Sequence, residues 1–169
     1  VMDREACEAA IDSLSEQLGR IDILINNAGM THRSLFEQTS PDVFDKIMGV
    51  NYFGSLYCTQ FALPRLKASK GSIVVISSIS GFSPLFGRTG YAASKYALHG
   101  LFESLRCELR PSGVHIMIVC PGFTKTGIEH NALGGDGGKA HQSRQTTGKV
   151  STPEEVAEAV VKGVLRRKN

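Results

Sequence analysis

Tyr91 and Lys95 lie four positions apart, and Ser78 precedes Tyr91 by thirteen residues. Residues i and i+4 of a helix are neighbours on one face, so a helix here would place the phenol beside the ammonium. A phenol ordinarily keeps its proton until about pH 10. A nearby cation favours the phenolate and lowers that pKa. The pair therefore predicts a proton donor and acceptor for the interconversion of an alcohol and a carbonyl compound.

Ordinary explanations compete with this interpretation. A tyrosine and a lysine at this spacing also occur by chance, with the tyrosine packed on a sheet and the lysine reaching into solvent. Polar and glycine-containing clusters after strands are also typical of simple turns. Only the joint occurrence of several such clusters, in order along the chain, favours a catalytic site.

The composition fits a globular core. Of the 169 residues, 41% are hydrophobic and 21% are charged. The 19 lysines and arginines exceed the 16 acidic residues by three, which is too small an excess to predict nucleic-acid binding. No apolar run reaches the roughly 18 residues of a membrane span. We therefore expect no nucleic-acid partner and no membrane span within the sequence.

The cysteines and histidines indicate compartment and metal content. Four cysteines are scattered without paired spacing, which indicates thiols in a reducing, cytoplasmic environment. Targeting by a segment before Val1 stays open. Five histidines show no ligand spacing, so we expect no metal site.

Three short apolar runs alternate with helical patterns. The expected strands are 21–25, 72–78 and 114–119, and the expected helices are 4–19, one that opens at Ser40-Pro41, one that carries Tyr91 and Lys95, and one from the capping box at Thr152. We expect Pro64 to end or kink the second helix. Continuous apolar strands that alternate with helices predict an α/β fold with a doubly wound parallel sheet.

Each expected strand is followed by a small or polar cluster. These clusters are Asn26-Asn27-Ala28-Gly29, Ser77-Ser78, and Pro121-Gly122-Phe123-Thr124. In open α/β sheets, ligands bind outside the carboxyl ends of the strands. We therefore expect the three clusters to line one cleft, with Phe82, Leu85, Phe86 and Phe123 near it favouring an apolar alcohol or ketone.

Taken together, these motifs resemble the short-chain dehydrogenase/reductase (SDR) family from about residue 3 to residue 164. The resemblance is carried by Asn26-Asn27-Ala28-Gly29, Asn51, Ile76-Ser77-Ser78-Ile79-Ser80-Gly81, Tyr91 to Lys95, and Pro121-Gly122 with Thr124 and Thr126. It implies an oxidoreductase that transfers a hydride between NAD or NADP and a small-molecule alcohol or ketone. It also implies a Rossmann-like sheet of which residues 1–169 are a single partial domain, the C-terminal portion.

The resemblance also implies a role for each matching residue. Tyr91 would be the general acid/base at the substrate oxygen. Lys95 would lower the pKa of Tyr91 and bond the nicotinamide ribose. Ser78 would donate to the substrate oxygen, and Asn51 would hold a water that links Lys95 to solvent.

Cofactor contacts are implied for three further clusters. Asn27, Ala28 and Gly29 would lie along the adenosine side. The backbone of Thr124 would bind the nicotinamide carboxamide, and Thr126 would lie close to the phosphates.

Parts of the family pattern have no counterpart in the sequence. The family opens with a strand, a Gly-rich turn and a helix, and then a strand that selects NAD or NADP. Their size implies about sixty residues before Val1, and one more strand is expected after the last helix. The near match to a dinucleotide fingerprint at 135–140 follows no expected strand, so we interpret it as part of a loop that covers the substrate.

Two alternatives stay open. Relatives that epimerise or dehydrate nucleotide sugars also use a tyrosine and a lysine four apart, although the cluster at 26–29 points away from them. A truncated, catalytically inert paralogue could serve as a scaffold. In the full-length form we expect a homodimer or homotetramer, for which Phe53, Tyr57 and Phe61 would supply an apolar helix face.

The missing motifs lead to a first prediction. The purified 169-residue chain should bind dinucleotide poorly and turn over little substrate, because a helix N-terminus that binds the pyrophosphate is not encoded in it. Oxidation of NADPH by this chain, followed by absorbance, tests the expectation. Robust oxidation would contradict it.

Overall fold

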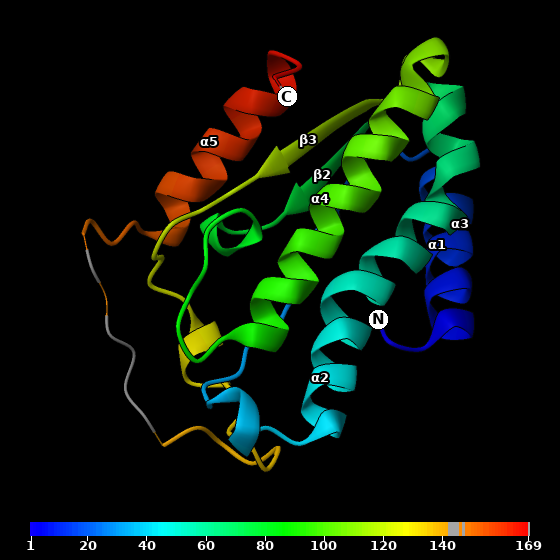
Figure 1. Cartoon of the computed structure of the whole chain (residues 1–169). Coiled ribbons are helices and arrows are strands. Elements are labelled where there is room, and N and C mark those ends of the chain that lie inside the picture. The colour runs from blue at the N-terminus through cyan, green and yellow to red at the C-terminus, as the bar shows by residue number, and fades with distance from the viewer. Residues whose placement is uncertain (142–145, 147, 169) are drawn as a thin grey trace.

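The centre of the fold is a small parallel sheet. The computed structural model describes residues 1–141, 146 and 148–168 (Figure 1). Within that part of the chain, β1 (Ile23–Asn26), β2 (Ser72–Ile76) and β3 (His115–Val119) form one sheet in the order β1-β2-β3. Both neighbouring pairs are parallel. The predicted α/β fold with a parallel sheet is confirmed.

Among the residues that the structure describes, five α-helices connect and cover the strands. They are α1 (Arg4–Leu18), α2 (Pro41–Met48), α3 (Gly54–Ser69), α4 (Thr89–Leu109) and α5 (Pro153–Leu165). The Asp3 and Ser40 side chains cap α1 and α2 by accepting hydrogen bonds from backbone N–H groups, as their residue types favour. None of the described helices is both long enough and apolar enough to pass through a bilayer.

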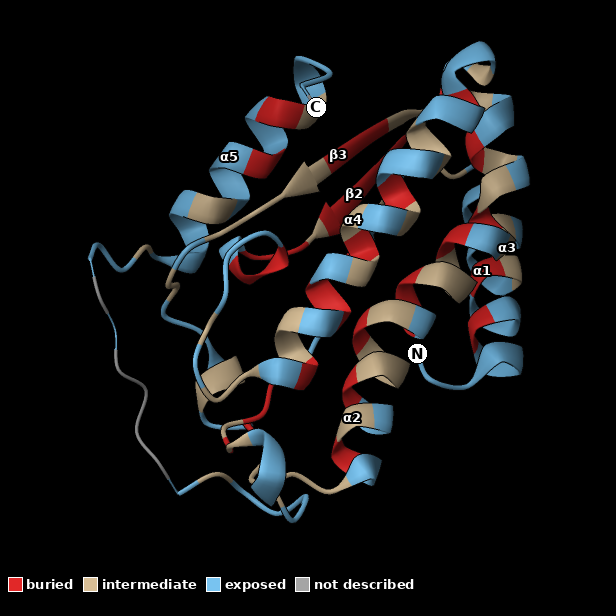
Figure 2. Cartoon of the chain, viewed as in Figure 1, coloured by how far each residue is buried: buried red, intermediate tan, exposed pale blue. Residues whose placement is uncertain are grey.

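The two faces of the sheet are covered by different helices. Alternate residues of a strand point to opposite faces. Ile73, Val75 and Ile116 belong to a core shared with α1, α3 and α4, while Val74 and Met117 pack with α5. Figure 1 shows α4 crossing in front of β2 and β3, and Figure 2 shows buried residues filling β2 and recurring along α4.

Pro64 was expected to end or kink the helix, and the expected end is wrong, because α3 continues through Pro64 to Ser69. Proline removes one helical N–H donor. However, Ala62 and Leu66 on either side of Pro64 are fully buried in the core. Tertiary packing of that face outweighs the missing hydrogen bond.

A π-helical turn, Gly49–Phe53, joins α2 to α3. We did not expect this feature from the sequence. Such turns widen a helix locally and frequently occur at functional sites. Here the turn carries Asn51, whose side chain is fully buried.

The capping box of α5 leads to the second prediction. The Thr152 hydroxyl accepts from the Glu155 backbone N–H at 3.2 Å, and the Glu155 carboxylate accepts from the Thr152 backbone N–H at 3.0 Å. Thr152→Ala should lower the free energy of unfolding by about 1 kcal/mol. Thr152→Ser keeps the hydroxyl and should cost much less. Urea unfolding of both variants measures the difference, and equal losses would contradict a capping role.

Candidate active site

A cavity of about 750 Å³ opens at the carboxyl ends of the three strands. Its lining includes Ile25 of β1, Ile76 of β2 and Pro121 just after β3, so the carboxyl ends of all three strands border it. The start of α4 and residues of α5 complete the walls. This is the position at which parallel α/β sheets bind ligands.

Every predicted site residue except Asn51 lines this cavity. The lining members are Asn27, Ala28, Gly29, Ser78, Tyr91, Lys95, Thr124 and Thr126. Ser78 follows β2 and Tyr91 lies in the first turn of α4, so two separate elements bring these hydroxyl groups to one cavity.

Lys95 is buried beneath Tyr91. The Lys95 residue is only 5% exposed, and its Nζ donates a hydrogen bond to the Ile76 carbonyl at 2.8 Å. Nζ lies 5.7 Å from the centroid of the Tyr91 ring. Burial lowers the pKa of Lys95 from 10.5 to about 8. A pKa near 8 still leaves the Lys95 ammonium mostly protonated at pH 7.

Asn51 lies behind the cavity wall and links two of its segments. Its Oδ1 accepts from the Met30 N–H at 2.8 Å, and its Nδ2 donates to the Met30 carbonyl and to the Ser94 Oγ at 3.0 and 2.8 Å. Ser94 in turn donates to the Tyr91 carbonyl at 2.7 Å. A Cβ at Gly29 would lie 3.4 Å from Asn51 Oδ1 and 3.7 Å from Lys95 Nζ, so the Gly29 backbone passes close to both groups.

Ser78 presents a hydroxyl in a buried position. The residue is 9% exposed, and its Oγ accepts from the Ser80 N–H at 3.1 Å. A serine hydroxyl that accepts one hydrogen bond still has a proton to donate. Ser78 is thus able to donate toward an oxygen held in the cavity.

The apolar part of the cavity differs from expectation in two places. Leu85 and Phe123 line it as predicted. Phe82 and Phe86 are absent from the lining and are 59% and 89% exposed. The loop between β2 and α4 turns both rings outward, which no local pattern in the sequence indicated.

Other residues of the site were missed by sequence reasoning. Val156 and Val160 of α5 line the cavity, which their helical spacing alone does not indicate. Arg88 lines it as well, and its Nη1 donates to the Thr31 hydroxyl at 2.7 Å. His32 is buried beside the start of α4, and a lone histidine in the sequence carried no signal for that position.

Residues 135–140 form a compact turn outside the cavity lining. The Gly134 N–H donates to the Gly138 carbonyl at 2.8 Å, and the Ser40 N–H donates to the Gly135 carbonyl at 2.8 Å. No described strand leads directly into this turn and no described helix begins from it, as a dinucleotide fingerprint would require.

Comparison with known proteins identifies the family. The chain matches the short chain dehydrogenase family over residues 1–135. It therefore belongs to the short-chain dehydrogenase/reductase family, a family of oxidoreductases.

Curated relatives cover nearly the whole chain. Dehydrogenase/reductase SDR family member 7B of Xenopus tropicalis is 38% identical over 167 residues, which are 98% of this chain and 54% of that protein. Dehydrogenase/reductase SDR family member 7 of Homo sapiens is 39% identical over 152 residues, 86% of this chain and 45% of that protein. The chain spans about half the length of the curated relatives it matches.

Solved structures share the fold. A short-chain dehydrogenase from Streptomyces avermitilis aligns with a TM-score of 0.82 and 26% identity, over 96% of this chain and 63% of that one. Gluconate 5-dehydrogenase from Burkholderia cenocepacia, solved with NADP and tartrate, aligns with a TM-score of 0.73 and 28% identity, over 76% of this chain and 51% of that one. An alcohol dehydrogenase from Thermococcus sibiricus, complexed with 5-hydroxy-NADP, shares the fold at 24% identity and a TM-score of 0.80, over 94% and 63% of the two chains.

The burial of Lys95 leads to the third prediction. The pKa of Lys95 is about 8 in the fold against 10.5 as the ordinary value, so the unfolded chain binds more protons between those pH values. Stability should therefore rise with pH through this window, by up to about 3 kcal/mol. In Lys95→Met this contribution is absent. Urea unfolding of both proteins at pH 7 and pH 10 measures the difference, and parallel pH profiles would contradict the assignment.

Proposed function

We propose that the complete protein containing this chain is an NAD(P)-dependent oxidoreductase that interconverts an alcohol and a carbonyl compound. Residues 1–169 would form one partial Rossmann-like domain that carries the reacting groups. The main support is the convergence of Ser78, Tyr91 and Lys95 on one cavity at the carboxyl ends of the strands. Membership of the family and the spacing of these residues agree with it.

Tyr91 would exchange the proton. In carbonyl reduction its phenol Oη gives a proton to the substrate oxygen, and in alcohol oxidation the phenolate takes that proton back. The Ser78 hydroxyl would donate a hydrogen bond to the same oxygen and stabilise the negative charge that develops on it. When bound, the nicotinamide supplies or accepts the hydride.

Lys95 would adjust the acidity of Tyr91. The Lys95 ammonium lies one helical turn from Tyr91 and is buried. Charges interact more strongly in such a buried position than in bulk water. The positive charge favours the phenolate. Asn51 would support this arrangement by holding a water that connects Lys95 to solvent.

The lining of the cavity fits an anionic dinucleotide. Among the described lining residues, the charged ones are Arg88 and Lys95, so the charged lining is cationic. Ala28 and Gly29 line the cavity next to β1 with small or no side chains. Asn27 to Gly29 would follow the adenosine side, while Thr124 and Thr126 would lie along the carboxamide and phosphates. The solved relative bound to NADP supports a nicotinamide cofactor, NAD or NADP.

The remaining walls favour an apolar substrate. Leu85, Phe123, Ile128 and Val156 contribute side chains to the same cavity as Tyr91. We therefore propose a small apolar alcohol or ketone, whose oxygen lies between the two hydroxyl groups.

Replacement of the phenol leads to the fourth prediction. In the complete protein, Tyr91→Phe should lower kcat by at least about a thousandfold, because the proton donor is lost. The cofactor dissociation constant should change by less than about threefold, since the ring is kept. Steady-state absorbance of the nicotinamide and a fluorescence titration measure the two quantities.

Tyr96→Phe is the matched control, because Tyr96 lies on the same helix, is 48% exposed and is absent from the cavity lining. It should keep the activity of the parent. Turnover by Tyr91→Phe at the parent's rate would refute the proposed function.

A further inference from the structure

His32 is a fully buried histidine whose two ring nitrogens both have partners. The residue is 0% exposed. Its Nε2 lies 3.0 Å from the Gly90 backbone nitrogen, and its Nδ1 lies 3.1 Å from the Ser34 Oγ. Gly90 immediately precedes Tyr91, so this imidazole contacts the backbone that carries the proposed proton donor.

The direction of each hydrogen bond follows from the backbone. The Gly90 N–H can only donate, so Nε2 must hold a lone pair and the ring proton must be on Nδ1. Nδ1–H then donates to Ser34 Oγ, Ser34 donates to Thr39 Oγ1 at 2.7 Å, and Thr39 donates to the Leu35 carbonyl at 2.6 Å. The neutral Nδ1–H tautomer of His32 therefore accounts for all of these hydrogen bonds.

The start of α4 lacks a local cap. The first N–H groups of a helix have no partner inside it. Arg88 is the N-cap residue of α4, and its side chain makes no capping hydrogen bond. His32 supplies an acceptor to the Gly90 N–H from 58 residues away along the chain. Burial and the Arg88 guanidinium lower the pKa of His32 below its usual range, which keeps the lone pair available.

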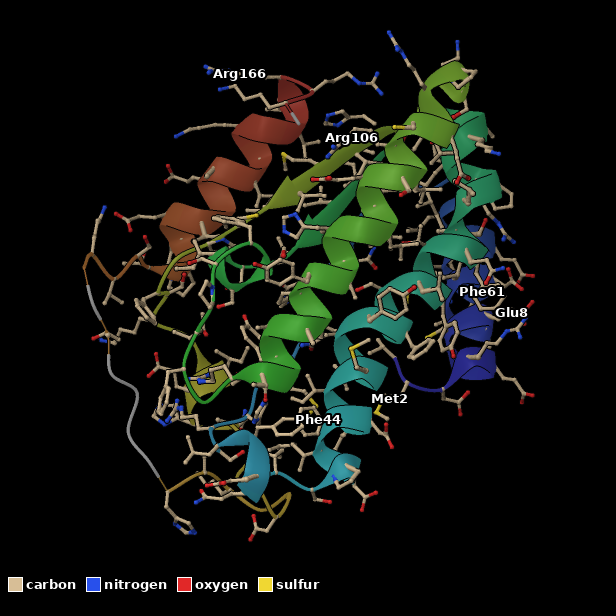
Figure 3. The ribbon with its side chains drawn as sticks, viewed as in Figure 1. Met2, Glu8, Phe44, Phe61, Arg106 and Arg166 are labelled. Carbon is tan, nitrogen blue, oxygen red and sulfur yellow. The ribbon has the colours of Figure 1, made fainter. Side chains whose placement is uncertain are left out.

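Packing reinforces this contact. The rings of His32 and Phe44 lie 5.8 Å apart, and a Cβ at Gly90 would lie 2.8 Å from Phe44 Cδ1 and 3.2 Å from His32 Nε2. Figure 3 labels Phe44 near the lower end of α4. Gly90 is thus held between the two rings, where a larger residue would displace the first turn of α4.

We propose that His32 is a positioning residue that fixes the first turn of α4, and with it the phenol of Tyr91, through the bond from Gly90. The inference rests on the proposed function, because it assigns His32 an effect on turnover through Tyr91. The segment that carries His32 also pairs with the backbone of Leu133, since the Arg33 N–H donates to the Leu133 carbonyl at 2.7 Å and the Leu133 N–H donates to the Thr31 carbonyl at 2.9 Å.

Three variants of the complete protein form the fifth prediction. His32→Phe keeps a ring against Phe44 but has no acceptor for Gly90, so kcat should fall about ten- to hundredfold, with KM within about threefold. His32→Gln can place Oε1 near the position of Nε2 and should restore kcat to within about threefold of the parent. His115→Phe makes the same ring exchange at the amino end of β3, away from the cavity, and should leave kcat unchanged.

The outcomes separate this inference from the proposed function. If Tyr91→Phe keeps full turnover, the proposed function fails. If Tyr91→Phe is inactive while His32→Phe keeps the kcat of the parent, the positioning role fails. Equal losses in His32→Phe and His32→Gln would also overturn it, because they would indicate lost packing rather than a lost acceptor.

A spectroscopic measurement tests the proposed hydrogen bonds of His32 even if the His32→Phe variant does not fold. Nitrogen-15 NMR of the imidazoles in the parent protein reports which ring nitrogen carries the proton. We expect a resonance pair of the Nδ1–H tautomer that is absent from His32→Gln and shifts in Ser34→Ala, which removes the acceptor of Nδ1–H. An Nε2–H tautomer or an imidazolium at neutral pH would overturn the proposal.

Discussion

The hydrogen bond from the Lys95 ammonium to the Ile76 carbonyl is the contact on which the geometry of the cavity depends. It ties the second turn of α4 to the last residue of β2 at 2.8 Å. Burial of a charged group costs free energy unless the group is bonded, and this carbonyl supplies the bond. Tyr91 lies one turn earlier on the same helix, so the attachment of Lys95 limits where the phenol can be.

Parallel topology explains why residues far apart in sequence meet at this point. Strands that run in one direction end at one edge, and the three turns that follow them become neighbours there. Ser78 lies in one of those turns, and α4 begins at the same edge with Tyr91 in its first turn. The segment between β2 and α4 therefore starts and ends at this edge, which brings the Ser78 and Tyr91 residues to one cavity.

Local sequence patterns are enough to predict the strands, the capping box at Thr152, and the placement of Tyr91 and Lys95 on one helix. Periodicity and turn chemistry act over a few residues, so these features can be predicted from short segments. Such patterns cannot predict features that depend on contacts between residues far apart in the sequence. Pro64 stays inside α3 because of packing with the core. Asn51 bonds Met30 across 21 residues from within a π-helical turn, and neither the turn nor the partner has a signature in neighbouring residues.

The start of α4 is also held by contacts from a distant part of the chain. With no cap from Arg88, the first turn of this helix is held by groups from the segment after β1: His32 at the Gly90 N–H and Met30 through Asn51 and Ser94. That segment also contributes Gly29 to the cavity wall. One short stretch of chain therefore shapes the wall beside β1 and holds the helix that presents the phenol. The position of Tyr91 relative to the wall at Gly29 is therefore set by contacts that this one stretch makes with the start of α4.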